Sequence, residues 1–587
     1  MCVSVAPLAL ADKPPVAPEF TGQVRLFIFE SEPGPTTRTA LSDMLSTSDN
    51  VESQPNPRRR RGYGAMRQCV EFLACLGIAV SLCKTFAVET YMIETGSMAP
   101  GFYGWHREVT CPQCRWHFAF GVEQDQGDGE AVCPNCGFRE IPVPALEADS
   151  GDSQNVAGDR VMVHKHLFDH RPPRRWEIAM FRNPGQPTEN YVKRIVGLPG
   201  ETIQIRDGDV YINGEIQRKT LDQQRQMRIA VFDNDYQPSA TDRTWHPRWR
   251  ARTEQSPWRV DDGNFDIRLK ETPGTSSDPS DWIDYQHWIR QGGLRTTTVP
   301  LAQWPSEADP PNPFFSNVTY DATKKQLVCR GAMPLAARDH LAGLSQDFAF
   351  QQAVDLLFER SHRAPITDGY GYNPSTSETP VRDLMLELQL TFSGGIGEFT
   401  VRMSDGREIM DCRLDFSRKM IQLYSSQQTT PIFEQPLPQS LFTGTAKLEM
   451  SLMDRQCLVA IDGVLIGQPW TYPVESSPSP LPQQPVQFGA AGINLRVSGI
   501  KLFRDVHYLS KSNEAAYLPY QLGDDEYFAL GDNSPISEDS RVWLAQPAAR
   551  KLTSRHFIGR PFLVHLPSKT WRSSISIPDF SRIRYIR

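Results

Sequence analysis

The sequence predicts a mainly β protein with one N-terminal transmembrane helix and two insertions into its β core. Three observations predict this fold class. Short runs that alternate apolar and polar residues recur along the chain, and Asp-Gly and Asn-Gly turn pairs separate them, which is typical of antiparallel sheets. A long apolar run follows four consecutive arginines near the N-terminus. Two C-x2-C pairs stand close together soon after that run.

The composition is that of an ordinary globular protein. The chain has 587 residues, a hydrophobic content of 39% and a formal net charge of −7. This length is enough for several domains. A protein that binds nucleic acid over much of its surface is usually basic, so we expect no nucleic-acid partner.

The apolar run covers residues 69–88 and has the length that a helix needs to cross a bilayer, about 20 residues. Glu71 and Lys84 lie near its two ends, where they could reach headgroups or water. The arginines at 58–61 favour a cytoplasmic N-terminus and an exported remainder of the chain. A buried core helix is the alternative interpretation of the same run.

The two cysteine pairs are "CPQC" at 111–114 and "CPNC" at 133–136. Two such turns can present four thiolates tetrahedrally, which predicts a structural zinc ribbon. Two disulfides are the alternative, because we place this region outside the cytoplasm. Four protein ligands leave no open position, so we do not expect a catalytic metal. The predicted ligands are Cys111, Cys114, Cys133 and Cys136.

Two further stretches hold residues that could act together. Ser97 follows the apolar run in "ETGSMAP", and Lys193 lies in "NYVKRIVG", which has the pattern of a strand. On that strand Lys193 shares a face with Tyr191 and Ile195, and apolar surroundings lower the pKa of a lysine. An uncharged lysine can activate a serine. Arg194 points to the opposite face, and we expect it to tolerate substitution.

Together four stretches resemble bacterial type I signal peptidase, a Ser-Lys endopeptidase. They are "GSMAP", "GDRVMV", "KRIVGLPGE" and "GDNSPISEDSR", and the resemblance covers about a quarter of the chain. Three details depart from the family pattern: Ser534 stands where arginine is common, Glu201 stands where aspartate is common, and "RRWEIAMF" lacks the usual Gly-Asp before its strand. None of these changes removes a catalytic atom.

The resemblance implies a role for six residues. It makes Ser97 the nucleophile, Lys193 the general base and Ser537 the residue that orients Lys193, with Asp539 and Arg541 as a supporting ion pair and the Ser97 N–H and Thr95 hydroxyl as the oxyanion hole. Catalysis would need no cofactor. If Lys193→Arg were active, the base would have to be sought among His106, His164 and His166.

The resemblance also implies a function. The expected activity is removal of signal peptides from exported preproteins, at the bacterial cytoplasmic membrane and in contact with its lipid. Strands near 92–93 and 160–164 would bind the peptide by β-addition and select small residues. One alternative is a cytosolic self-cleaving protease of the repressor type. Another is a degenerate relative that acts as a membrane-anchored binding or scaffold protein.

The segment 225–515 is an insert that such a core does not need. In "LMLELQLTF" leucines alternate with mostly polar residues, and the many short strands with Asp-Gly turns predict a β-sandwich. This insert resembles a laminin-G or concanavalin-like jelly roll. We expect a structural or docking role, with a protein or a carbohydrate as partner, and we expect peptidase activity to survive its replacement by a linker.

These expectations divide the chain into seven segments. They are a disordered cytoplasmic tail (1–62), a transmembrane anchor (63–90), a first catalytic core segment with the nucleophile (91–107), a zinc ribbon (108–156), a second catalytic core segment with the base (157–224), the β-sandwich insert (225–515) and a third catalytic core segment (516–587).

Overall fold

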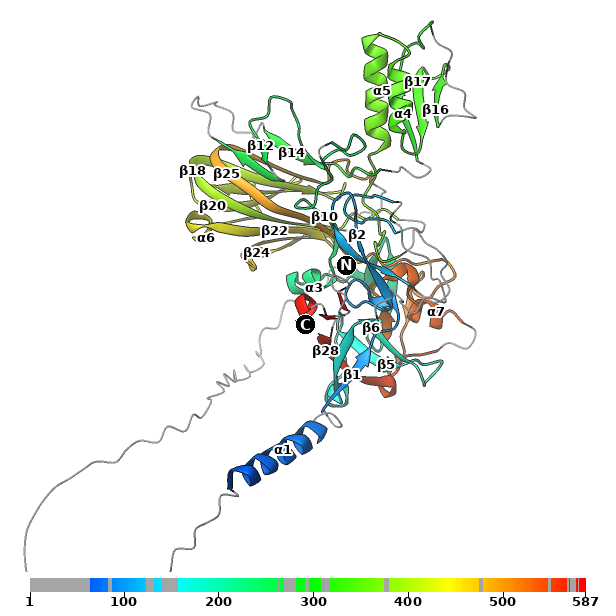
Figure 1. Cartoon of the computed structure of the whole chain (residues 1–587), viewed down its shortest axis with the longest axis vertical. Helices are drawn as coiled ribbons and strands as arrows, with labels where there is room; N and C mark the ends of the chain where they lie inside the picture. The colour runs from blue at the N-terminus through cyan, green and yellow to red at the C-terminus, as the bar shows by residue number, and fades with distance from the viewer. Residues whose placement is uncertain are drawn as a thin grey trace, which may run out of the picture. The chain divides into compact units, whose positions relative to one another are not determined.

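The computed structural model of the chain is mainly β, as predicted (Figure 1). Contacts group it into two units, 1–72 and 73–587, and every contact described below lies within the second. The predicted tail, 1–62, lies outside the described residues. These are 64–82, 87–122, 131–139, 141, 157–239, 241–261, 263–268, 281–290, 295–307, 310, 317–373, 379–473, 479–546, 550–566, 569–570, 577–578 and 580–586.

The apolar run forms helix α1 (Gly64–Leu82), whose large hydrophobic side chains from Met66 to Leu82 are exposed. Within the described part of the chain, no helix combines the length and the apolar character needed to cross a membrane. The structure therefore does not confirm the transmembrane anchor predicted over 63–90. The end of the apolar run is only partly described, because residues 83–86 lie outside the described residues.

A seven-stranded sheet joins the three predicted core segments. Its order is β1-β4-β28-β5-β6-β27, and β31 also pairs with β28. Strand β6 pairs with β5, which precedes it directly, and with β27, which is distant in sequence. Ala179 of β5 lies opposite Lys193, and Leu530 of β27 lies opposite Arg194. The strands are β1 (Val88–Met92), β4 (Arg160–Lys165), β5 (Ile178–Arg182), β6 (Asn190–Gly197), β27 (Phe528–Leu530), β28 (Phe557–Leu566) and β31 (Arg584–Tyr585).

Smaller elements surround this sheet. A four-stranded sheet has the order β26-β7-β8-β9, and β2 and β3 form the hairpin that carries the first cysteine pair. The elements are β2 (His106–Thr110), β3 (His117–Gly121), α2 (Leu167–His170), β7 (Thr202–Arg206), β8 (Asp209–Ile212), β9 (Glu215–Ile216), α3 (Leu221–Met227), β26 (Tyr520–Gln521), α7 (Ser540–Trp543), η4 (Ser554–His556), β29 (Lys569–Thr570), β30 (Ile577–Pro578) and η5 (Phe580–Arg582).

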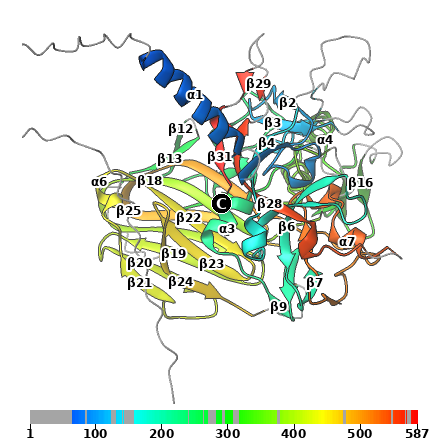
Figure 2. The ribbon, with the colours of Figure 1, turned by 90° about the horizontal axis from the view of Figure 1, so that it is seen from below.

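Two long strands organise the insert. Strands β18 (Leu384–Ser404) and β25 (Val486–Arg504) pair along most of their length within a thirteen-stranded sheet (Figure 2). Their register shifts near Gly395, where φ is +113° and an added Cβ would lie 2.5 Å from the Gly492 carbonyl oxygen. This bulge lets both strands bend, and their inward side chains form one core.

The first half of β18 pairs with β22 and its second half with β19, so two branches of the sheet share the same long strand. Strands β10, β13 and β14 pair with the other edge of β25. The elements are β10 (Ile229–Asp233), β11 (Trp249–Ala251), β12 (Arg259–Asp261), β13 (Asn264–Ile267), β14 (Trp282–Tyr285), β19 (Ile409–Asp415), β20 (Met420–Ser425), β21 (Phe433–Pro436), α6 (Ser440–Thr443), β22 (Thr445–Met453), β23 (Gln456–Ile461) and β24 (Val464–Thr471).

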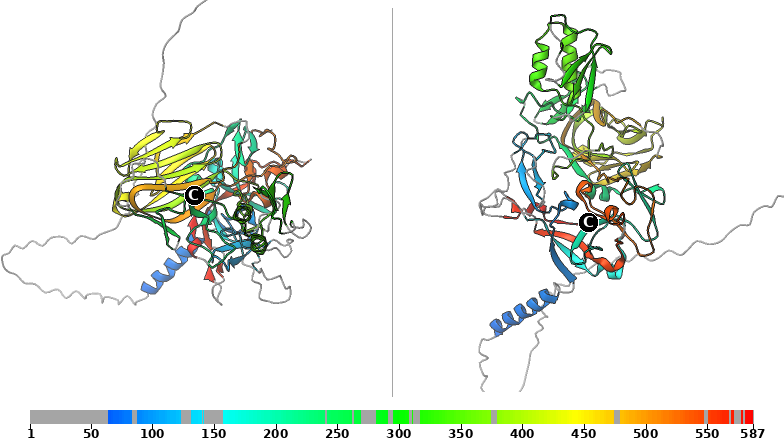
Figure 3. Two further views of the ribbon diagram at one scale, coloured as in Figure 1. Left: turned by 90° about the horizontal axis from the view of Figure 1, so that it is seen from above. Right: turned by 90° about the vertical axis from the view of Figure 1, so that its right-hand side faces the viewer.

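The insert also contains a helical lobe, which was not predicted from the sequence. Helix α5 (Phe348–Ser361) begins at Asp347, whose carboxylate accepts a hydrogen bond from the Ala349 N–H. It buries Phe350, Val354, Leu357 and Phe358, the spacing of one helix face. Figure 3 shows the lobe's helices beside its small sheet. The other elements are β15 (Thr296–Pro300), β16 (Val318–Asp321), β17 (Gln326–Arg330) and α4 (Leu335–Ala342).

An acidic cluster lies where the core joins the insert. The Lys219 ammonium donates to Asp454 Oδ1 at 2.5 Å and to Asp505 Oδ2 at 2.7 Å. Carboxylate oxygens of Asp209, Asp383 and Asp454 lie within 4.8 Å of one another. Burial, together with the neighbouring carboxylates, raises the pKa of Asp383 to about 7. One lysine thus faces an excess of carboxyl groups.

We predict that Asp383→Asn stabilises the protein at pH 8. The pKa of Asp383 is higher in the folded chain than the ~3.9 of an unfolded one, so its stabilising contribution is present below about pH 4 and is lost as pH rises through about 7. The melting temperature of the variant should exceed that of wild type by a few degrees at pH 8, and the gap should close at pH 5. Asp524→Asn, which changes an exposed carboxylate, should melt like wild type at both pH values. Equal melting temperatures of wild type and Asp383→Asn at pH 8 would contradict the prediction.

Candidate active site

Ser97 lies in a short 3-10 turn, η2 (Gly96–Met98), that directly follows β1. Its side chain is buried, with the whole residue 8% exposed, and its Oγ lies 3.3 Å from Thr95 Oγ1. Met98 and Ala99 are also buried and anchor the turn in the interior. A hydroxyl is thereby held in place at the end of an edge strand.

Lys193 lies in the middle of β6 and is 4% exposed. Its Nζ donates a hydrogen bond of 3.1 Å to Ser537 Oγ and lies 5.6 Å from the centre of the Tyr191 ring. Burial lowers the pKa of Lys193 to about 8, against opposing charge from Asp539. A substantial neutral fraction near pH 8 is what a lysine base requires.

Gly531 brings the segments of Ser97 and Ser537 together. A Cβ added at Gly531 would lie 2.5 Å from the Ser97 carbonyl oxygen and 2.2 Å from Ser537 Oγ. Turn η2 also packs near β6. Within the described residues, no hydrogen bond joins Ser97 Oγ directly to Lys193 Nζ. The structure thus places Ser97, Ser537 and Lys193 in one neighbourhood, with Ser537 as the direct partner of Lys193.

Two of the three carboxylates that act on the pKa of Lys193, those of Asp539 and Asp532, are held by arginines. Asp539 Oδ2 accepts from Arg541 Nη2 at 2.7 Å, and Asp539 Oδ1 accepts from its Nε at 2.8 Å. Asp532 is held in the same bidentate way by Arg194, at 2.6 and 2.8 Å. All four residues are buried. The carboxylates are therefore engaged, and Lys193 has a hydroxyl as its hydrogen-bond partner.

The expectation that Arg194 tolerates substitution is wrong. Arg194 is 2% exposed, and besides the Asp532 carboxylate it binds the Trp176 carbonyl oxygen at 2.7 Å. The alternation of side chains on β6 does place it opposite Lys193, but both faces of this strand are buried. A central strand with two covered faces cannot be distinguished from a half-exposed one by its alternation alone.

Asn533 holds η2, the turn that carries the predicted nucleophile Ser97, and was missed as a site residue. Its N–H donates to the Ser97 carbonyl oxygen at 3.0 Å, and its Nδ2 donates to the Gly96 carbonyl oxygen at 3.0 Å. Its amide also makes two 2.8 Å hydrogen bonds with the amide of Asn373, which belongs to the insert. The "GDN" sequence indicated a turn, and nothing in the sequence indicated the partner at 373.

Two tyrosines of the insert reach the same turn. An added Cβ at Gly96 would lie 2.0 Å from the Tyr372 ring, and Tyr372 donates to the Trp105 carbonyl oxygen at 3.0 Å. The Tyr370 hydroxyl donates to the Asp532 carbonyl oxygen. The segment 370–373 of the insert therefore lines the site directly.

Two of the departures from the family pattern, Ser534 and Glu201, make hydrogen bonds with nearby residues. Ser534 Oγ accepts hydrogen bonds from Arg541 Nη1 at 2.7 Å and from the Leu509 N–H at 2.8 Å. Glu201 accepts from Arg175 Nη2 at 2.5 Å and from the Leu198 N–H at 2.7 Å. Both side chains therefore have structural partners.

The three histidines considered as alternative bases have different surroundings. His106 is fully buried, its Nδ1 lies 2.7 Å from the Gly104 carbonyl oxygen, and burial lowers its pKa. His166 pairs with Asp169 at the exposed start of α2. His164 is an exposed residue of β4. In the part of the chain that the structure describes, none of the three hydrogen-bonds to Ser97 Oγ.

The four cysteines form two equivalent turns. The Arg115 N–H donates to the Cys111 carbonyl oxygen at 2.9 Å, and the Gly137 N–H donates to the Cys133 carbonyl oxygen at 2.8 Å. Arg115 and Gly137 both have positive φ, +62° and +68°. The same backbone path at both pairs is what a symmetric pair of metal-binding knuckles requires.

The sulfur positions fit a structural zinc site. The Sγ atoms of Cys111 and Cys136 lie 3.6 Å apart, as do those of Cys114 and Cys133. A disulfide would need about 2.05 Å, whereas a tetrahedral zinc site with ~2.3 Å bonds separates sulfurs by about 3.8 Å. All four thiols are free and buried. The donor set thus favours zinc over the disulfide alternative.

Comparisons with known proteins match the region around Lys193. The sequence profile of the family "Signal peptidase, peptidase S26" matches residues 143–265. A portion of this chain resembles signal peptidase I. The signal peptidase I of Pseudomonas aeruginosa is 34% identical over 99 residues, which cover 14% of this chain and 35% of that protein. The enzyme of Leptolyngbya laminosa is 42% identical over 84 residues, which cover 13% and 36%.

A longer match is to the signal peptidase I of Pseudomonas fluorescens, 25% identical over 172 residues, which cover 25% of this chain and 58% of that protein. The chain therefore spans between about a third and three-fifths of the length of these relatives. The family profile includes Lys193 but neither Ser97 nor Ser537. The roles of these serines stay predictions.

Solved structures resemble the chain only weakly. They include the galectin LEC-6 of Caenorhabditis elegans, with 14% identity, a TM-score of 0.15 and coverage of 20% of this chain and 81% of that one. They also include the carbohydrate-binding module CBM66 of Bacillus subtilis, with 14% identity, a TM-score of 0.14 and coverage of 21% and 72%. At these TM-scores the likeness does not define the fold or the ligand of the insert.

We predict that Arg194→Gln strongly destabilises the protein. It leaves the buried Asp532 carboxylate without its cation, and breaking a buried pair in this way typically costs about 3–5 kcal/mol. Urea denaturation should show the loss, and the exposed Arg182→Gln of β5 should behave like wild type. Equal unfolding midpoints for Arg194→Gln and Arg182→Gln would refute the structural role of this pair.

We also predict about one zinc ion per chain, bound with a folding role. Cys133→Ser should lower the melting temperature and the zinc content together, as measured by thermal unfolding and by elemental analysis. Cys412→Ser, which changes a buried cysteine of β19 outside the ribbon, should leave the zinc content unchanged. Purified protein that lacks zinc and carries Cys–Cys bridges in mass mapping would instead establish the disulfide alternative.

Proposed function

We propose that this chain is a serine endopeptidase that removes signal peptides from exported preproteins by a Ser97–Lys193 mechanism. The observation that carries the proposal is the buried Lys193, with its pKa lowered to about 8 and its Nζ 3.1 Å from Ser537 Oγ. The match of 143–265 to the signal peptidase family supports the reaction class. The buried, oriented hydroxyl of Ser97 supplies a nucleophile in the same neighbourhood.

In the proposed reaction, neutral Lys193 takes the proton of Ser97 Oγ as this oxygen attacks the scissile carbonyl carbon. The Ser97 N–H and the Thr95 hydroxyl, 3.3 Å from Ser97 Oγ, would bind the oxyanion. The protonated lysine then gives its proton to the leaving amine, and water hydrolyses the serine ester. Contacts between nucleophile and base are often long without substrate and tighten when it binds.

The edge of the core sheet suits an extended peptide. Strand β1 ends just before the nucleophile turn, and among the described strands it pairs only with β4. A peptide could therefore add to its other edge and present its scissile bond to Ser97. Selection of small residues beside this strand belongs to the proposal.

Membrane attachment also belongs to the proposal. Signal peptides lie in the bilayer, so a peptidase for them works best at the lipid surface. The exposed apolar side chains of α1 would suit contact with lipid. The single-pass anchor over 63–90, the cytoplasmic N-terminus and the exported catalytic region stay predictions, as does the bacterial cytoplasmic membrane as location.

The decisive experiment is cleavage of a preprotein by wild type, Ser97→Ala and Lys193→Arg. Both variants should lose at least ~10²-fold in rate, since a guanidinium stays protonated and cannot act as a base. The wild-type rate should rise with pH through about 8, because the base acts only when neutral. An active Lys193→Arg would reject the dyad. Full activity of Ser97→Ala would reject the peptidase and leave the scaffold alternative.

We further predict that the insert supports catalysis, against the expectation that a linker can replace it. Asn373→Ala removes both hydrogen bonds to Asn533, the residue that holds the Gly96 and Ser97 carbonyls. The acylation rate of Ser97 should fall about tenfold or more, measured by active-site titration at a temperature where the variant is folded. Exposed Gln435→Ala on β21 is the matched control. An unchanged acylation rate would show that the insert only docks.

A further inference from the structure

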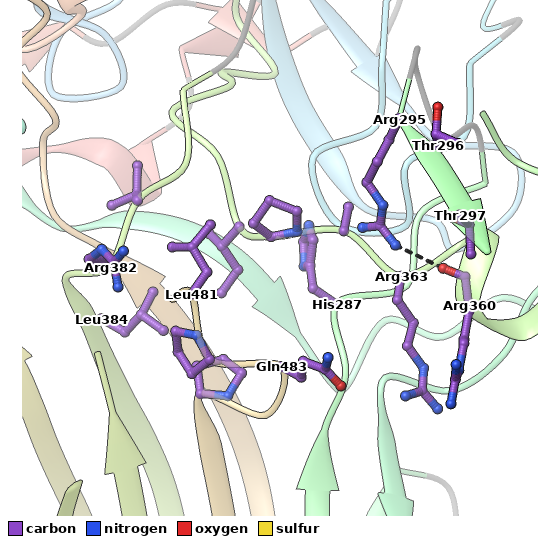
Figure 4. Close-up of a pocket in the computed structure, with 16 residues that line it drawn as sticks. His287, Arg295, Thr296, Thr297, Arg360, Arg363, Arg382, Leu384, Leu481 and Gln483 are labelled. Atoms are coloured by element: carbon purple, nitrogen blue, oxygen red, sulfur yellow. Dashed lines mark hydrogen bonds between the residues drawn. The ribbon is translucent and has the colours of Figure 1, made fainter. Parts of the chain in front are cut away.

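A cavity of about 460 Å³ lies within the insert, between the helical lobe, the start of β18 and the segment 481–485 that precedes β25. Figure 4 shows Arg295, Arg360 and Arg363 on one side of it, and Arg382 with Leu384 on the other. Neither Ser97 nor Lys193 lines this cavity. Its volume falls in the range of small-molecule sites, ~300–1,000 Å³.

The charge of the lining is unbalanced. Four arginines line the cavity, and among the described residues no aspartate or glutamate does. Arg363 forms an ion pair with Glu359, which also pairs with Arg250. Within the described part of the chain, Arg295, Arg360 and Arg382 form no ion pair. Three guanidinium groups at one cavity thus lack a carboxylate partner.

The hydrogen bonds of Arg295 and Arg382 go to carbonyl oxygens and not to carboxylates. Arg295 donates to the Arg360 carbonyl oxygen at 2.9 Å, and Arg382 donates to carbonyl oxygens of Asp405, Ser479 and Pro480. Neutral carbonyls orient a guanidinium without neutralising it. Burial lowers the pKa of both Arg295 and Arg382; at Arg382 the charge of Arg407 adds to this effect and the charge of Asp405 opposes it.

Two buried donors at the cavity are also unused. Thr297 is 8% exposed, and its hydroxyl has no hydrogen-bond partner among the described residues. The Nε of Arg363 is likewise buried and without a partner there. Buried polar groups are normally satisfied, and these two donors are available to an acceptor in the cavity.

Apolar side chains make up a further part of the lining. Leu384, Leu481 and Pro485 contribute to it, and Figure 4 shows the two leucines on the side away from Arg360. His287 lies between the two sides, and burial keeps its pKa well below the usual value, so the histidine is neutral at pH 7. A ligand would therefore meet three arginines on one side, and two leucines with Arg382 beside them on the other.

We propose that this cavity binds a small organic anion, with its carboxylate or phosphate group on Arg295, Arg360 and Arg363 and its apolar body against Leu384 and Leu481. Guanidinium groups bind carboxylate and phosphate by paired N–H donors, which fixes orientation as well as charge. The site would make the insert a ligand-binding module. This inference does not depend on the proposed peptidase activity.

The test is calorimetric titration of the full chain with four probes of one chain length: hexanoate, hexyl phosphate, hexanol and hexyltrimethylammonium. At least one anion should bind once per chain, more weakly at high salt, and the alcohol and the cation should bind at least tenfold more weakly. Comparison of the two anions identifies the preferred head group. No saturable binding of either anion, or equal binding of hexanol, would overturn the proposal.

Variants localise the binding. Arg360→Gln and Arg295→Gln change exposed arginines without a described ion pair, so both proteins should fold, and each should lose at least tenfold in anion affinity. Thr297→Val keeps the shape of the side chain and should lose a smaller factor. Exposed Arg259→Gln on β12 is the matched control and should bind like wild type. Unchanged affinity in both arginine variants would also overturn the proposal.

Discussion

The ammonium group of Lys193 lies in the protein interior with a hydroxyl, not a carboxylate, as its hydrogen-bond partner, and the surrounding structure maintains this arrangement. Asp539, Glu538 and Asp532 all act on its pKa, and two of these three carboxylates are held by arginines, Asp539 by Arg541 and Asp532 by Arg194. If either of the two arginine-held carboxylates were free to pair with Lys193, the pKa of the lysine would rise and less of it would be neutral. The two ion pairs therefore keep Asp539 and Asp532 from pairing with Lys193.

The same region is assembled from distant segments of the chain. Gly531 allows the segments of Ser97 and Ser537 to approach, and Asn533 binds the nucleophile turn through its backbone and its side chain. The insert enters after β9 and leaves before β26, strands of one small sheet. It nevertheless returns to the site, because Asn373 pairs with Asn533. The insert, whose two ends join the core at the same small sheet, thus contributes residues that line the site.

The sequence predicted what depends on local pattern. Alternation placed Lys193 on a strand, and the cysteine spacing predicted the compact cluster of Cys111 and its partners. Contacts between distant segments could not be read in this way. Nothing near Asn373 marks it as a partner of Asn533, and the burial of Arg194 depends on a strand more than 300 residues later. Helix α5 was missed because its apolar spacing lies within a segment whose other signals are β.

A rise in pH has opposite expected effects on the site and on the junction between core and insert. Lys193 becomes neutral as pH rises through about 8, which favours the proposed catalysis. Over a similar range the carboxyl of Asp383, with its pKa raised to about 7, becomes charged beside Asp454 and Asp505, which weakens the junction between core and insert. Since Asn373 of the insert supports the nucleophile turn through Asn533, a loosened junction would reach the site. Because Asp383 titrates at a lower pH than Lys193, most of this loss of stability has already occurred at the pH where Lys193 becomes neutral.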